Sequence, residues 1–168
     1  DFLNVGSMGH ASSVALGIAL EKTERKVVAL DGDSACMMHM GAMTMVSKLD
    51  APNFMHVVLN NGSHESVGGQ PSAGHKVDFT KIAEACDYAT VGHPVTTEVE
   101  LVEALEVLRD CGKASFIDCR IHKGLSRKLP PVIFDHREVI DALIDDLNES
   151  RIIMDNKTKF RINRKKGI

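Results

Sequence analysis

Apolar and polar positions follow one another along the chain in blocks that predict strands and helices in turn. Short apolar runs typical of buried strands occur at residues 26–31, 53–59 and 114–121, with a weaker run at 88–91. Helical periodicity marks the segments between and after them: 12–21, 35–48, 78–87, 97–109 and 136–148. Strands separated by helices of this length indicate parallel crossovers. We therefore expect an α/β fold, a three-layer, doubly wound, mostly parallel sheet with helices on both faces.

Composition narrows the class of protein. A net charge of −3, no Trp and one Tyr argue against general binding to nucleic acid. No apolar run approaches the ~20 residues that span a bilayer, so we expect no membrane insertion. The four cysteines are scattered without a CxxC pair, which predicts reduced thiols that act as small core residues in a cytoplasmic protein.

The predicted elements suggest one domain and a tail. We expect residues 1–150 to form the domain and residues 151–168 to form a polar, basic C-terminal tail. The basic run at 161–166 is interpreted as part of an exposed terminus. Because the chain begins with Asp1 and reaches a glycine motif almost at once, we expect that a longer gene product continues upstream.

Polar residues follow two of the predicted strands, at the point where each strand ends. The block Gly32-Asp33-Ser34 follows the first strand, and Asn60-Asn61 follows the next, with 25 residues between Ser34 and Asn60. In an open parallel sheet, ligands bind beyond the carboxyl ends of the strands. Both blocks fall at that edge, so we expect them to meet.

These residues supply oxygen ligands. Asp33 offers a carboxylate, Asn60 or Asn61 offers an amide oxygen, and the carbonyl of Ser63 lies within reach of the same point. Mg²⁺ prefers such hard oxygens and commonly takes only one or two from side chains, the rest coming from phosphate and water. Each block alone would also suit a helix cap or a turn. The two together, each directly after a strand, favour a Mg²⁺ site.

The block Gly32-Asp33-Ser34 also begins a predicted helix. The backbone amides of Asp33, Ser34 and Ala35 lie at its start, where unpaired N–H groups and partial positive charge favour a phosphate. A metal ion and a helix start at one place favour a diphosphate bound through Mg²⁺.

This spacing resembles the signature of thiamine diphosphate enzymes, in which Gly-Asp-Gly is followed at a similar distance by Asn-Asn. Ser34 stands at the third position of the first triplet, a departure that matters if this position needs a positive φ. The resemblance implies that Asp33, Asn61 and the carbonyl of Ser63 bind Mg²⁺. It also implies that Asn60 supports the turn rather than the metal.

A third block, at residues 5–12, resembles the loop that holds the middle of thiamine diphosphate. The resemblance implies that the Gly6 carbonyl accepts a hydrogen bond from the 4′-amino group of the cofactor. It also implies that Met8 separates the two cofactor rings. The expected cofactor-binding residues, taken together, are Gly6, Ser7, Met8, Gly9, His10, Gly32, Asp33, Ser34, Ala35, Asn61, Ser63 and His64.

Residues 2–20 and 57–72 closely resemble phosphonopyruvate decarboxylases, within a likeness that covers roughly residues 1–125 and is weak beyond Lys128. Sulfopyruvate decarboxylases are close relatives. The resemblance implies decarboxylation of a small 2-oxoacid, 3-phosphonopyruvate, to phosphonoacetaldehyde and CO₂. The loop at 62–75 would then cover the substrate. Its polar side chains would handle protons or the phosphonate, and the expected catalytic residues are His64, Glu65 and Gln70.

The family implies a partner for this chain. Its members activate the cofactor with a glutamate from a pyrimidine-binding domain, which we expect on a separate domain or subunit, in a homo-oligomeric assembly. Two alternatives stay open: another thiamine diphosphate-dependent reaction of 2-oxoacids, such as sulfopyruvate decarboxylation or carboligation, and a non-catalytic binding module that keeps the fold without the cofactor.

Overall fold

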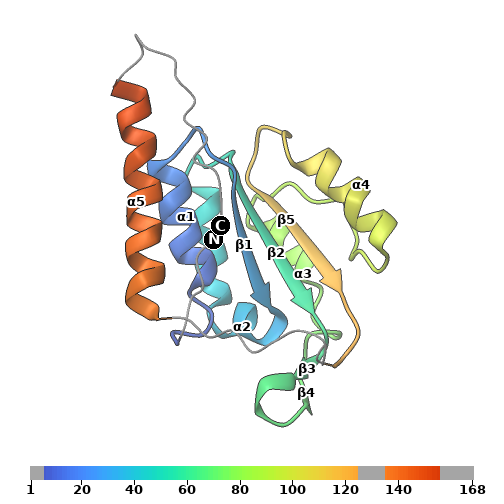
Figure 1. Ribbon diagram of the computed structural model, residues 1–168. Helices are drawn as coiled ribbons and strands as arrows, with labels where there is room; N and C mark the ends of the chain where they lie inside the picture. Colours follow the sequence, from blue (N-terminus) through green and yellow to red (C-terminus); the bar gives the residue numbers. More distant parts are fainter. Residues whose placement is uncertain (1–5, 125–134, 156–168) are drawn as a thin grey trace. The chain divides into compact units, whose positions relative to one another are not determined.

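A computed structural model describes residues 6–124 and 135–155 of the chain (Figure 1). The chain divides into two compact units, one formed by Gly6–Leu129 and one that contains the last helix. The helices are α1 (Ala11–Glu21), α2 (Asp33–Met38), η1 (Met40–Ser47), η2 (Glu65–Val67), α3 (Phe79–Ala85), α4 (Glu98–Leu108) and α5 (His136–Asp155). The strands are β1 (Val27–Gly32), β2 (Phe54–Asn60), β3 (Ser63–His64), β4 (Gln70–Pro71) and β5 (Ser115–Arg120).

Three parallel strands form the sheet of the first unit, in the order β1-β2-β5. β2 lies in the centre, and its side chains are buried on both faces over most of its length, as its continuous apolar run predicts. β1 lies at one edge and alternates between buried and exposed side chains. The prediction of a parallel α/β sheet is confirmed.

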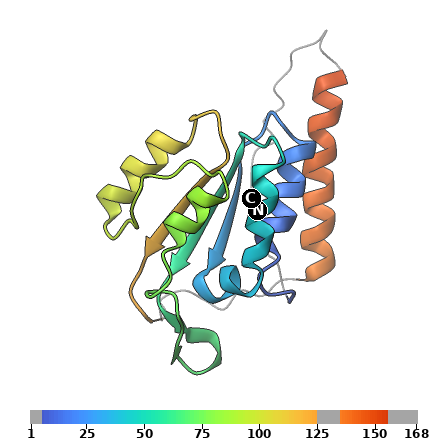
Figure 2. The same cartoon turned by 180° about the vertical axis from the view of Figure 1, so that it is seen from behind.

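Helices cover both faces of this sheet. On one face, α1, α2, η1 and α3 pack on a cluster that includes Ala19, Ala29, Cys36, Met43, Phe54, Val58, Phe79 and Phe116. On the other face, α4 packs on a smaller cluster that includes Met55, Val57, Ala104, Leu108, Ile117 and Cys119. Figure 2, seen from behind, shows α3 in front of the strands. The arrangement confirms the predicted three layers.

The helix predicted at residues 35–48 is in fact two shorter helices. α2 begins earlier, at Asp33, and ends at Met38, and the 3₁₀ helix η1 begins at Met40. His39 between them leaves the helical conformation, with φ −131° and ψ 38°. Its ring packs against that of His10, with centroids 4.1 Å apart. Apolar periodicity does not reveal this contact with the N-terminal loop, so the prediction joined the two helices.

The strand predicted at residues 88–91 is a single parallel bridge between Ala89 and Ser115. Gly92 and Pro94 follow almost directly and leave no room for a longer ladder. α4 begins close to the predicted position, because Thr97 and Glu100 form a capping box. Such a cap contributes about 1 kcal/mol to helix stability.

The second unit contains α5, which continues to Asp155 rather than ending at residue 148. Residues 149–155 contain neither Gly nor Pro, so nothing in the local sequence ends the helix earlier. The basic run at 161–166 lies outside the described residues. The division into a domain at 1–150 and a tail at 151–168 stays a prediction.

All four cysteines are free. Cys36, Cys86 and Cys119 are buried, as predicted, but Cys111 is exposed, because it lies in the turn between α4 and β5 and its thiol contacts the Lys113 carbonyl. Within the described ranges, no helix combines the length and the apolar character needed to cross a bilayer.

Candidate functional site

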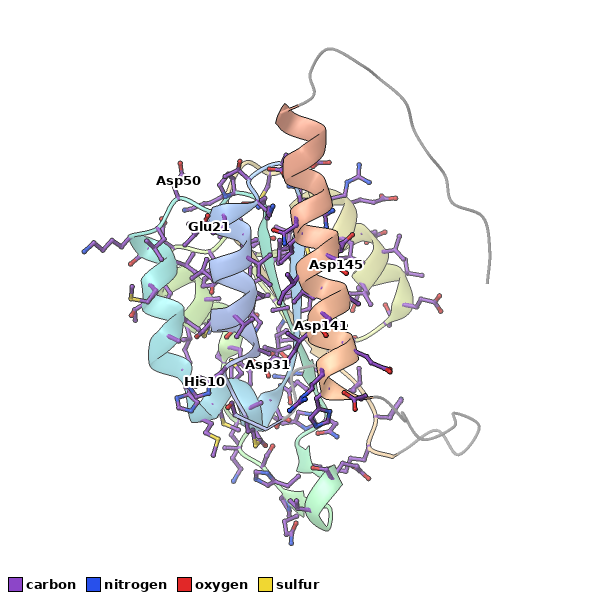
Figure 3. The ribbon with its side chains drawn as sticks, turned by 60° about the vertical axis from the view of Figure 1, so that its left-hand side comes forward. His10, Glu21, Asp31, Asp50, Asp141 and Asp145 are labelled. Carbon is purple, nitrogen blue, oxygen red and sulfur yellow. The ribbon has the colours of Figure 1, made fainter. Side chains whose placement is uncertain are left out.

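The carboxyl ends of β1, β2 and β5 meet at one edge of the sheet. Gly32 pairs with Leu59, and Asn60 pairs with Arg120, so the residues that follow each strand are neighbours. Figure 1 shows the small β3–β4 hairpin beyond the arrowheads of the three strands. In Figure 3, His10 and Asp31 lie at this end of the first unit, whereas Glu21 and Asp50 lie at the opposite end. The topology thus gathers the predicted blocks at one edge.

Asp33 is the first residue of α2 and is only 2% exposed. Its Oδ2 accepts a hydrogen bond from the Ser72 hydroxyl, and the Gly74 amide donates to the same hydroxyl oxygen over 3.1 Å. A Cβ atom on Gly74 would lie 2.5 Å from Oδ1 of Asn60 and closer still to Oδ2 of Asp33. The Asp33 carboxylate, directly after β1, and the Asn60 amide oxygen, at the end of β2, therefore flank one point of the backbone.

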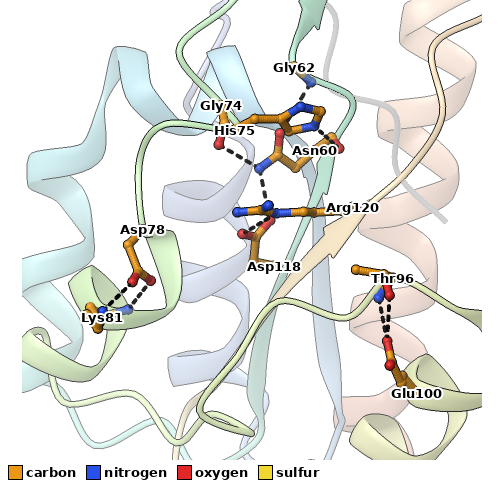
Figure 4. Close-up of polar contacts among 10 residues, drawn as sticks. All are labelled: Asn60, Gly62, Gly74, His75, Asp78, Lys81, Thr96, Glu100, Asp118 and Arg120. Atoms are coloured by element: carbon orange, nitrogen blue, oxygen red, sulfur yellow. Dashed lines mark hydrogen bonds and ion pairs between the residues drawn. The ribbon is translucent and has the colours of Figure 1, made fainter.

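Asn60 is fully buried and makes hydrogen bonds with every part of its amide (Figure 4). Its Nδ2 donates to the Gly74 carbonyl over 2.9 Å and to Oδ1 of Asp118 over 3.1 Å. Its Oδ1 accepts from the Gly62 amide over 3.3 Å. Asn60 therefore ties the turn after β2 to the loop at 72–74 and to β5, which is the supporting role that the family resemblance implies.

Asn61 lies one residue further along, and its side chain is half-buried. Its Oδ1 accepts from the Ser63 amide over 3.0 Å, which closes a short turn. Ser63 is 5% exposed, and its hydroxyl has no hydrogen-bond partner in the described part of the chain. The side chains that the structure places around Gly74 are those of Asp33 and Asn60, and the assignment of Asn61 and Ser63 as metal ligands stays a prediction.

The loop at residues 6–10 packs against the start of α2. Gly9 has a φ of 86°, and a Cβ there would lie 2.6 Å from the Ala35 carbonyl oxygen and 2.7 Å from the His39 ring. Both the amide and Nδ1 of His10 lie 3.1 Å from the Ser7 carbonyl, which makes the loop a tight turn. Met8 at its tip remains 48% exposed. The structure thus brings the glycine-rich loop at residues 6–10 beside the helix that follows Gly32.

Ser34 occupies an ordinary helical position inside α2 and is not among the residues with positive φ. The replacement of the family's glycine by serine therefore introduces no backbone strain. The Ser34 hydroxyl is buried without a hydrogen-bond partner among the described residues. A buried hydroxyl of this kind calls for an acceptor, and a phosphate oxygen would satisfy it.

The predicted substrate residues lie together on the hairpin. His64 and Gln70 are register partners across β3 and β4, and Glu65 begins the 3₁₀ turn between them. Oε2 of Glu65 is buried and has no hydrogen-bond partner among the residues that the structure describes. The geometry groups these three side chains, and their catalytic roles stay a prediction.

Negative charge collects beneath this edge. Asp31, Asp33 and Asp118 are each less than 7% exposed. Asp31 lies 3.4 Å from Nε2 of the buried His56, and burial raises the pKa of Asp118. Burial also raises the pKa of Cys36 to about 12, an effect to which all three carboxylates add, so this thiol is protonated at neutral pH.

Asp33 itself forms no ion pair within residues 6–124 and 135–155. The same residues contain no group of three His, Cys, Asp or Glu side chains placed to hold a metal. A cation at this edge would therefore depend on Asp33 together with amide and carbonyl oxygens. That donor set suits Mg²⁺ better than Zn²⁺.

Three residues that contact the predicted site were not expected from the sequence: Ser72, Gly74 and Asp118. Asp118 did carry a signal, because a carboxylate in the middle of the apolar strand β5 needs a buried partner. Ser72 and Gly74 lie in a loop rich in Gly and Ser, where no local pattern distinguishes them from their neighbours.

The chain matches known proteins over most of its length. The model of the C-terminal TPP-binding domain of thiamine pyrophosphate enzymes matches residues 2–119. The phosphonopyruvate decarboxylase of Streptomyces viridochromogenes is 42% identical over 104 residues, which cover 62% of this chain and 26% of that protein. The sulfopyruvate decarboxylase subunit beta of Methanothermobacter thermautotrophicus is 34% identical over 146 residues, which cover 87% of this chain and 75% of that subunit.

The chain thus spans about a quarter of the length of the phosphonopyruvate decarboxylases that it matches. Among solved structures, the thiamine diphosphate-dependent 4-hydroxybenzoylformate decarboxylase of Rhodococcus jostii RHA1 aligns with a TM-score of 0.59 at 19% identity. The alignment covers 71% of this chain and 24% of that one. At this identity the match supports the fold alone.

Proposed function

The chain belongs to the thiamine pyrophosphate enzyme family, whose C-terminal TPP-binding domain it matches, and we propose that it is the diphosphate- and Mg²⁺-binding half of a 3-phosphonopyruvate decarboxylase. One observation carries the proposal: the buried Asp33 carboxylate lies beside an amide oxygen from the next strand end, without a cationic partner in the described residues. A buried carboxylate in this situation favours a bound cation.

The residues at the sheet edge fit the cofactor. Asp33, Asn61 and the Ser63 carbonyl would hold Mg²⁺, and the amides of Asp33, Ser34 and Ala35 would face the diphosphate. The buried, unpaired hydroxyls of Ser34 and Ser63 support this assignment, because each lacks the partner that a phosphate oxygen or metal-bound water would supply. Thiamine diphosphate, when bound, supplies an electron sink for the loss of CO₂.

The chain's own side chains would orient the reactants. The exposed Met8 would separate the two cofactor rings, and the Gly6 carbonyl would accept from the cofactor's amino group. On the hairpin, His64, Glu65 and Gln70 would bind the phosphonate group of the substrate and hold protons near the reacting carbon. The partnerless oxygen of Glu65 supports this role, since a proton held there would satisfy it.

The proposal includes a partner that carries a pyrimidine-binding domain and its activating glutamate. Two kinds of relative support it. The chain covers three quarters of a protein named as a subunit, but only a quarter of the phosphonopyruvate decarboxylases. We infer that the remaining half of the site comes from another domain or subunit, within an oligomer.

Phosphonopyruvate is proposed over sulfopyruvate because the two phosphonopyruvate decarboxylases are 42% identical to the chain, against 30–34% for the sulfopyruvate decarboxylases. The test is an assay of the assembly with phosphonopyruvate, sulfopyruvate and pyruvate as separate substrates. We expect the highest kcat/KM with phosphonopyruvate. Preference for sulfopyruvate would establish the alternative substrate, and a lack of Mg²⁺-dependent thiamine diphosphate binding would establish a non-catalytic module.

Replacing Met8 with alanine tests the ring-separating role. We expect Met8→Ala to lower kcat more than it weakens cofactor binding, because the cofactor would still be held by its diphosphate but with its rings less well oriented. The measurements are kcat and the Kd for thiamine diphosphate. Met45→Ala is a matched control, since Met45 is 47% exposed on η1 and Met8 is 48% exposed. A loss confined to cofactor affinity would contradict the proposed role.

A further inference from the structure

We propose that Ser72 is a positioning residue for the Asp33 carboxylate, so that the loop at 72–74 builds the cation site together with the ends of β1 and β2. The inference rests on the proposed function and adds to it a residue outside the glycine and asparagine motifs. Ser72 lies 39 residues from Asp33 in the sequence, and only the fold brings them together.

The Ser72 hydroxyl takes part in two hydrogen bonds, accepting one and donating the other. The Gly74 amide donates to the Ser72 hydroxyl oxygen over 3.1 Å, and the same hydroxyl donates to Oδ2 of Asp33. The hydroxyl proton is therefore committed to one carboxylate oxygen. Oδ1 of Asp33 makes no hydrogen bond within the described part of the chain, which leaves it as the oxygen available to a cation.

The loop that carries Ser72 is tied down on both sides. The Ser72 amide donates to the Gly62 carbonyl over 3.0 Å, and the Gly74 carbonyl accepts from Nδ2 of Asn60 over 2.9 Å. Asn60 is anchored in turn by Oδ1 of Asp118 at 3.1 Å (Figure 4). Because the hydroxyl is presented by a fixed backbone, it can hold the carboxylate in one orientation.

Because Asp33 is buried, the orientation that Ser72 gives to its carboxylate should affect the affinity for a cation. Asp33 is 2% exposed, so its carboxylate has little access to water that could replace the contact. A hydrogen bond to an ionised carboxylate is also stronger than one between neutral groups. Residues that orient metal ligands typically change metal affinity by 10- to 100-fold when they are removed, and we expect an effect of that order here.

The test compares Ser72→Ala with the conservative Ser72→Thr, in the assembly with the pyrimidine-binding partner. Calorimetry measures the Mg²⁺ concentration that gives half-saturation of thiamine diphosphate binding, and the electron paramagnetic resonance signal of Mn²⁺ reports directly on the cation. Ser47→Ala is the control, because the exposed Ser47 hydroxyl donates only to the Thr44 carbonyl within η1. The thermal midpoint without Mg²⁺ and cofactor shows whether each variant keeps its fold.

We expect Ser72→Ala to weaken Mg²⁺ binding about 10- to 100-fold while the metal-free thermal midpoint stays close to that of the parent. Ser72→Thr should recover most of the affinity, and Ser47→Ala should match the parent. Unchanged Mg²⁺ affinity in Ser72→Ala, or a loss that threonine does not recover, would overturn the role of Ser72 alone. If the parent itself showed no Mg²⁺-dependent binding, the proposed function would fail and this inference with it.

Discussion

Replacing Asp33 with alanine should abolish Mg²⁺-dependent retention of thiamine diphosphate while leaving the fold largely intact. Loss of residues that merely orient a metal ligand costs 10- to 100-fold in affinity, so loss of the proposed carboxylate ligand should cost more than about 100-fold. The fold should survive because Asp33 makes one side-chain hydrogen bond, to Ser72, and no ion pair within the described residues. Removing a buried, unpaired charge also removes its desolvation cost.

The measurement is cofactor binding by calorimetry at increasing Mg²⁺, with circular dichroism to monitor the fold. Asp33→Asn keeps the shape of the side chain and should lose affinity as well, since an amide oxygen lacks the negative charge. Asp50→Ala is the control, because Asp50 is an exposed carboxylate at the opposite end of the unit (Figure 3). If Asp33→Ala retained the cofactor as the parent does, the metal assignment would be wrong.

Adding one methyl group at Gly74 should have the second large effect. The Cβ of Gly74→Ala would lie 2.5 Å from Oδ1 of Asn60 and closer to the Asp33 carboxylate, well inside van der Waals contact. Neither neighbour has room to move, since Asn60 is fully buried with three hydrogen bonds and Asp33 is 2% exposed. We expect unfolding to require about 1–3 kcal/mol less free energy, and Mg²⁺-dependent cofactor binding to be lost.

Denaturant unfolding and calorimetry would measure these two effects. Gly17→Ala is a suitable control, because Gly17 is exposed on α1 and a Cβ there would meet no atom within 4 Å. Its stability should stay equal or rise by up to about 1 kcal/mol, as alanine favours a helix over glycine. Normal stability and normal cofactor binding in Gly74→Ala would show that the loop at 72–74 moves away from Asp33 in solution.

Local sequence patterns correctly predicted those helices and strands whose bounds depend on their own residues. The alternation of apolar runs with helical segments predicted both ends of β1, β2, β5, α1, α3 and α4 to within one or two residues. It was wrong about the helix at 35–48, which is broken at His39, where the ring packs against that of His10. It also predicted a strand at 88–91, where Gly92 and Pro94 limit the pairing to one bridge.

The candidate site was likewise predicted only in part from the sequence. The positions of Asp33 and Asn60 at one sheet edge followed from two strand ends and the rule for parallel sheets. Neither the choice of Asn60 as the neighbour of Asp33 nor the contact with Ser72 could be predicted, because both depend on how the loop at 62–75 folds back. Gly and Ser side chains in such a loop are too small and too similar to encode that path.

By itself, therefore, the amino-acid sequence determined the parallel α/β architecture and the edge at which a carboxylate and amides would gather, because both follow from periodicity and chain order. Only the tertiary structure decided which groups surround the carboxylate. Asn60 meets Gly74 across 14 residues, Asp33 meets Ser72 across 39, and Asn60 meets Asp118 across 58. Contacts over such separations arise from the packing of the whole unit, so no local pattern records them.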